Sequence, residues 1–148
     1  MTEVLSPILA EIIIEAPIAH VWQVLTSAAT VPAWLGCMHY RPEIGATFHM
    51  QMDEMKRAAG DISGATWCDV LVLQEPHSFS FTWYVPANAK TTVHISLFSE
   101  GAGRTVVRLM HDGWNQFPAD LVTAFHAQLT GGWRGAVLPN LKRAAEAA

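Results

Sequence analysis

The stretch TWCDVLVLQEPHSFSFTWYV, residues 66–85, contains the pattern that decides the fold. Residues 66–74 are mostly apolar, residues 75–77 (Glu-Pro-His) predict a turn, and from Ser78 onward aromatic and small polar side chains alternate. Alternation is typical of a strand with one buried face, because successive side chains point to opposite sides. The stretch therefore predicts two strands joined by a turn, with Phe79, Phe81 and Trp83 facing the core.

Elements on both sides of this hairpin extend the same sheet. Pro17 is suited to the first turn of a helix, and the apolar spacing after it predicts a short helix over 17–26, followed by a second over 31–35. The polar segment 53–61 is expected to be a plain connection between strands. Four further runs are rich in β-branched residues or alternate in polarity, and they predict strands at 8–15, 47–52, 91–99 and 104–111.

The last thirty residues change to a helical period. Apolar side chains recur about every four residues and predict a helix from about 119 to 146. A glycine inside a helix costs about 1 kcal/mol and a proline about 3. Gly131, Gly132 and Pro139 therefore predict a kink, with the two glycines allowing a close approach. The element order predicts one α+β domain over residues 1–148.

Composition narrows the class of protein. Hydrophobic residues make up 51% of the 148 and charged residues 15%, which excludes intrinsic disorder. The net charge is −4 and no basic cluster occurs, which argues against a nucleic-acid partner. No apolar run is long enough to span a membrane, and the start lacks signal-peptide features. Cys37 and Cys68 lack metal-binding spacing, so two reduced thiols in a cytoplasmic protein are expected.

Several short motifs carry a family resemblance. They are Ala-Pro-Ile-Ala-His-Val-Trp at 16–22, the run 69–76, His-Asp-Gly-Trp at 111–114 and Gly-Trp at 132–133. In this order they resemble the SRPBCC (START-like, helix-grip) superfamily. Within it they resemble the branch of the activator of heat-shock protein 90 ATPase, which also holds the calicheamicin-resistance protein. The resemblance implies a curved antiparallel sheet of about six strands around a long C-terminal helix, with a cavity between them.

Three histidines are candidates for functional groups: His49, His94 and His111. Period-2 alternation places His111 on the core side at the end of its strand, where it could contact a ligand or serve only as a hydrogen-bonding structural residue. The same alternation places His49 and His94 on the solvent face. A three-histidine metal site needs all three on one face, so we expect no metal. Asp69 faces solvent with Trp67 and Leu71 or marks a bulge, and the pattern does not decide between the two.

The apolar excess, six tryptophans and six methionines favour a cavity that accepts varied apolar shapes. We predict a small apolar or aromatic ligand between sheet and C-terminal helix, with no cofactor and no catalytic residue. Trp34 is expected beside the cavity opening. The predicted ligand-binding residues are Trp34, Met50, Met52, Phe81, Trp83, His111, Phe125, Leu129 and Trp133.

Two other functions stay open at this point. The family resemblance alone suggests a co-chaperone that acts on the heat-shock protein 90 ATPase. Cyclases and lyases also occur on this fold, and His111 is the residue that could serve one as an acid or base. A homodimer is a further option, because excess apolar residues can also lie in an oligomer interface.

Overall fold

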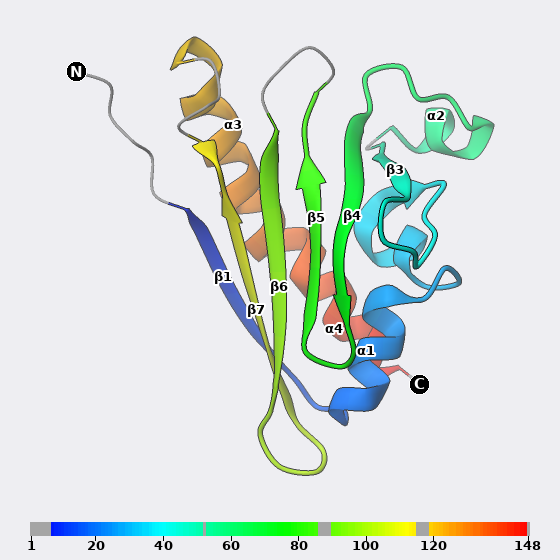
Figure 1. Cartoon of the computed structure of the whole chain (residues 1–148), viewed down its shortest axis with the longest axis vertical. Coiled ribbons are helices and arrows are strands. Elements are labelled where there is room, and N and C mark those ends of the chain that lie inside the picture. Colours follow the sequence, from blue (N-terminus) through cyan, green and yellow to red (C-terminus); the bar gives the residue numbers. More distant parts are fainter. Residues whose placement is uncertain (1–6, 52, 86–89, 115–118, 148) are drawn as a thin grey trace.

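The computed structural model describes residues 7–51, 53–85, 90–114 and 119–147, except for the side chains of 119–122 and 125. Seven antiparallel strands form one open sheet in the order β1-β7-β6-β5-β4-β3-β2. The C-terminal helical segments cross behind this sheet, as Figure 1 shows in orange and red. The strands are β1 Ile8–Ile14, β2 Cys37–Met38, β3 Thr47–Met50, β4 Thr66–Gln74, β5 Ser78–Trp83, β6 Thr91–Ser99 and β7 Thr105–Asp112.

This arrangement confirms the predicted α+β helix-grip class, including the hairpin that the opening stretch predicts. Phe79, Phe81 and Trp83 are all buried on the inner face of β5. The two short helices after β1 are α1 Ile18–Thr26 and the π-helical turn η1 Pro32–Gly36. The sheet has one strand more than expected, because β2 is too short to leave a pattern in the sequence.

The segment predicted as a plain connection contains a helix, α2 Glu54–Ala59. Asp53 caps it by accepting hydrogen bonds from the backbone N–H groups of Met55 and Lys56, and Gly60 ends it at φ +71°. None of its residues is buried, so no apolar period marks it. The local capping residues, rather than hydrophobic spacing, are the signal that predicts this helix.

The predicted C-terminal helix forms as three consecutive segments: α3 Ala119–Gly132, the π-helical turn η3 Trp133–Val137 and α4 Leu138–Glu146. Within η3, the backbone N–H of Leu138 donates to the carbonyl of Trp133, five residues earlier. Pro139 then lies in the first turn of α4, where a missing N–H costs little. The wide turn thus explains how a proline is tolerated inside this helical stretch.

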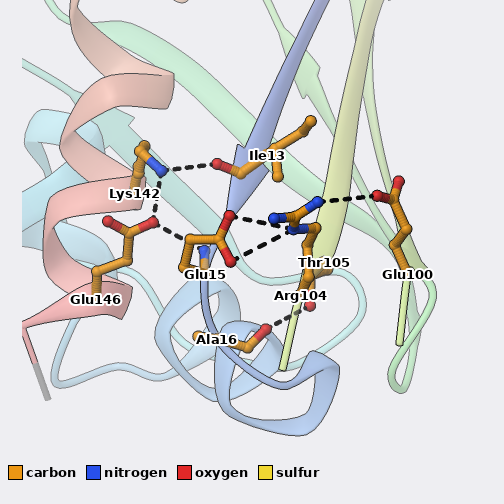
Figure 2. A network of polar contacts seen from close by, with 8 residues as sticks. All are labelled: Ile13, Glu15, Ala16, Glu100, Arg104, Thr105, Lys142 and Glu146. Carbon is orange, nitrogen blue, oxygen red and sulfur yellow. Dashed lines mark hydrogen bonds and ion pairs between the residues drawn. The ribbon is translucent and has the colours of Figure 1, made fainter. Parts of the chain in front are cut away.

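Side chains of the C-terminal segments cover the free edge of β1 (Figure 2). Lys142 Nζ donates to the carbonyl of Ile13 at 2.8 Å, and Glu146 accepts from the backbone N–H of Glu15 at 2.8 Å. Nearer the start of the strand, Arg134 Nε donates to the carbonyl of Leu9 at 2.9 Å. These contacts fasten the helix to the sheet at the edge strand.

Candidate functional site

A cavity of about 200 Å³ lies between the sheet and the C-terminal helical segments, where the sequence predicts a ligand. The sheet contributes Met50, Thr66 and Trp83, and the helical side contributes the rest of the wall. No charged side chain lines it among the described residues. The helical lining residues are Gln128, Leu129, Gly132, Trp133 and Val137.

Four of the predicted ligand-binding residues are brought together here: Met50, Trp83, Leu129 and Trp133. Phe81 lies two residues before Trp83 in β5 and is fully buried, with its ring packed against Phe48 at a centroid distance of 5.3 Å. Met52 and the Phe125 side chain lie outside the described residues.

Trp34 is not at the opening of this cavity. Its ring is 2% exposed, and its indole N–H donates to the carbonyl of Val24 at 3.0 Å. This bond holds the indole inside the core beside α1. The position of Trp34 next to the short helices predicts a place beside the opening, but the sequence does not reveal which way the ring turns.

Three residues of the wall were not predicted from the sequence: Thr66, Gln128 and Val137. Val137 belongs to the apolar series of the C-terminal helix, so its period could have included it. Thr66 and Gln128 are polar, and a search for apolar lining residues passes over them. They supply the hydroxyl and amide groups that a largely apolar pocket uses to orient a ligand.

Gly132 borders the cavity in a way that its neighbour Gly131 does not. A Cβ atom built on either glycine meets nothing within 4 Å. Gly132 lines the cavity, whereas Gly131 is exposed and is not part of the wall. The absence of a side chain at Gly132 therefore leaves open the space that a ligand would use.

His111 lies behind this wall, fully buried, and both of its ring nitrogens are engaged. Thr91 Oγ1 donates to the carbonyl of Trp83 at 2.7 Å, so its contact of 2.7 Å with His111 Nε2 must be one in which it accepts. On the other side of the ring, Trp133 Nε1 donates to His111 Nδ1 at 3.1 Å. The proton therefore sits on Nε2, and the imidazole is neutral.

Burial lowers the pKa of His111 to about 3, with smaller contributions from His126 and His94. A ring whose two nitrogens are both bonded offers no free proton and no free lone pair to a substrate. The prediction that His111 faces inward is confirmed. The geometry makes His111 a positioning residue that connects two residues of the cavity wall. It reaches the backbone carbonyl of Trp83 through Thr91, and it accepts a hydrogen bond directly from the indole of Trp133.

The contacts on the outer face of the sheet resolve the orientation of Asp69, which the sequence left open. Asp69 accepts a hydrogen bond from Thr47 at 2.7 Å and forms an ion pair with Lys90 at 3.2 Å. Burial raises the pKa of the Asp69 carboxyl, but these polar contacts outweigh burial and lower the pKa. A register shift follows directly, between Val70 and Val72. His94 lies on the same outer face and contacts Ser80 Oγ at 3.1 Å.

A second hollow of about 500 Å³ lies on the outer face between β1, β7 and β6. It is larger than the inner cavity but contains no aromatic ring in its wall apart from His94. Its Arg108 is already paired with Glu11 at 2.8 Å. The inner cavity, enclosed by two indoles, matches the features of a ligand site better.

Comparison with known proteins now identifies the family. The family model for activator of Hsp90 ATPase homolog 1-like proteins matches residues 15–146. The chain belongs to this family, AHSA1. Among curated protein sequences, none matches this AHSA1-family chain.

Solved structures share the AHSA1-family fold at low sequence identity. The Aha1 dimer from Colwellia psychrerythraea is 19% identical with a TM-score of 0.74, covering 96% of this chain and 97% of that one. An HSP90 activator from Plasmodium falciparum is 15% identical with a TM-score of 0.69, at coverages of 93% and 94%. A putative protein of the dynemicin biosynthetic locus is 20% identical with a TM-score of 0.70, covering 94% of this chain and 46% of that one.

Among the described helices, none is both long and apolar enough to cross a membrane.

Proposed function

We propose that this AHSA1-family protein binds a small, uncharged, mainly aromatic molecule in the cavity between sheet and C-terminal helix. The supporting observation is the wall itself: two indoles, a thioether and two aliphatic side chains around about 200 Å³. A dry apolar cavity of about 150 Å³ is known to accept benzene. The space here therefore suits a ligand of one or two rings.

The lining of the cavity also favours an uncharged ligand. Transfer of an ionised group into an apolar site costs far more than transfer of a neutral one unless a partner charge is present. The described lining offers only the hydroxyl of Thr66 and the amide of Gln128 as polar partners. A neutral ligand with one hydroxyl, carbonyl or amide group fits this set, because each lining group can donate or accept one hydrogen bond.

The two adjacent glycines provide a matched test. Gly132→Leu is expected to fill the cavity and to weaken binding of a bicyclic aromatic dye at least tenfold, which corresponds to about 1.4 kcal/mol. Gly131→Leu should bind like the wild type, because residue 131 is outside the wall. Both changes replace a helical glycine by a better helix former, so neither should cost helix stability. Quenching of Trp83 and Trp133 fluorescence reports the dissociation constant.

Equal binding by the wild type and Gly132→Leu would place the dye elsewhere and contradict the proposal. A panel of neutral aromatic dyes without any saturable response would do the same. Far-UV circular dichroism of both variants checks that the helix is intact.

A protein-partner role is the second candidate, supported by the family description and by the Plasmodium HSP90 activator of the same fold. A pull-down with the chaperone and an ATPase assay separate the two candidates, and we expect no stimulation. The Colwellia relative is described as a dimer, so a homodimer is also proposed here, and light scattering at two concentrations tests it.

A further inference from the structure

Two histidines meet at the outer face of the sheet, away from the cavity. His39 directly follows β2, and His49 lies in β3, paired in register with Met38. Their Nδ1 atoms are 3.0 Å apart, and the two rings stand at 88° with a centroid distance of 5.1 Å. Strand alternation in the sequence predicts the solvent face for His49, and no pattern singles out His39.

The backbone and the neighbours hold this pair in place. Among the described residues, His39 is the only non-glycine with a positive φ, +66°. This left-handed backbone conformation costs a residue other than glycine about 1–2 kcal/mol, so the surrounding structure must stabilise it. His49 is fixed by an edge-to-face contact with Trp67, at a centroid distance of 4.7 Å and an angle of 84°. The strained backbone and the braced ring hold the two Nδ1 atoms within hydrogen-bonding distance.

We propose that His39 and His49 bind one divalent late transition metal ion, Cu²⁺ in preference, through their Nδ1 atoms. Imidazole nitrogens coordinate such ions at about 2.0–2.1 Å. In square-planar coordination, two nitrogen ligands at 90° to each other therefore lie about 2.9 Å apart. The distance between the Nδ1 atoms of His39 and His49 is 3.0 Å, which is close to this value. Tetragonal nitrogen coordination is typical of Cu²⁺ and Ni²⁺, and the order of affinities favours Cu²⁺.

Water completes the coordination of this ion. The described residues hold no group of three or more His, Cys, Asp or Glu side chains that could share a metal. Asp69 faces the same side of the sheet, but its carboxylate is already bonded to Thr47, Tyr84 and Lys90. An ion with two protein ligands and exchangeable waters is open to small anions or to a redox partner.

The surroundings also indicate how tightly the ion is held. Burial and the neighbouring His39 lower the pKa of His49. His49 Nε2, however, is buried with no hydrogen-bond partner in the described structure. In tight metal sites the second ring nitrogen of a ligating histidine is hydrogen-bonded to a protein group, and losing that partner lowers the affinity for the metal about 10–100-fold. We therefore assign a reversible site that a chelator empties.

Titration with CuCl₂ tests the site, because a bound Cu²⁺ ion would lie beside the Trp67 indole and quench its fluorescence. His39→Gly removes one ligand without backbone strain, since glycine accepts the positive φ. His49→Phe removes the other and keeps a ring against Trp67. Each variant loses the chelate and should bind at least tenfold more weakly, whereas His94→Ala, on the same face, should bind like the wild type.

Electron paramagnetic resonance gives an independent readout, since a cis pair of imidazoles leaves a two-nitrogen coupling pattern on the Cu²⁺ signal. EDTA should restore the wild-type fluorescence. Equal affinity in the wild type and both ligand variants, or an equal loss in His94→Ala, would overturn the site and leave the histidines as a hydrogen-bonded pair. Gly132→Leu should bind Cu²⁺ normally, so this test is independent of the cavity.

Discussion

His111→Ala is expected to lower the free energy of unfolding by about 3–5 kcal/mol, the largest effect of any single change considered. The substitution leaves a void in the core. The indole N–H of Trp133, which donates to His111 Nδ1 at 3.1 Å, is left without its acceptor. The substitution also removes the donor to Thr91 Oγ1 at 2.7 Å. Urea denaturation followed by circular dichroism measures the difference.

His94→Ala provides the control for this loss. His94 lies on the outer face, is only half-buried and contacts Ser80 Oγ through Nδ1 at 3.1 Å. Its replacement should cost less than about 1 kcal/mol. A loss below 1 kcal/mol for His111→Ala as well would show that the network around Thr91 and Trp133 does not stabilise the fold.

Acid is expected to destabilise the protein through the same residue. The pKa of His111 is about 3 in the folded protein, against an ordinary value of 6.5. Below pH 6.5 this histidine therefore binds a proton in the unfolded chain but not in the folded one. The free energy of unfolding therefore falls as the pH falls, by about 1.4 kcal/mol per pH unit, until the pH nears the folded value. Between pH 7 and pH 5 the expected loss is about 2 kcal/mol.

Comparison of pH profiles isolates this contribution. Urea unfolding of the wild type and of His111→Phe is measured from pH 7.5 to pH 4, and the difference between the two curves is taken. Phenylalanine fills the site and does not titrate, so the variant should lack the His111 slope. A variant and a wild type with parallel profiles over this range would contradict the assignment of a neutral, buried imidazole.

The local pattern of the sequence was enough to predict the sheet and the long helix. Residues 78–83 alternate because one face of β5 is buried, and the four-residue period of the C-terminal stretch continues through the buried residues Trp133, Val137 and Leu141 of η3 and α4. The same logic correctly turned His111 inward. It missed β2, which has only two residues, and α2, which has no buried residue, so neither element shows a burial period.

The candidate site was predictable only in its apolar part. Met50, Trp83, Leu129 and Trp133 followed from the faces of their elements, because those faces are set by local periodicity. Thr66 and Gln128 depend on which strand end meets which helical turn, a tertiary relation that no local pattern encodes. The His39–His49 contact likewise requires the strand register of β2 and β3 and a positive φ at a non-glycine residue.

The fastening of the C-terminal segments along β1 has a consequence for self-association. An outermost strand exposes unpaired backbone groups that can template the addition of another chain. This one also carries apolar side chains in solvent, Leu9 at 58% and Ile13 at 42% exposure. Arg134 and Lys142 occupy the carbonyls of these two residues, so an incoming strand finds its acceptors taken. The helical segments that line the cavity thus also cover backbone acceptors that a neighbouring strand would need.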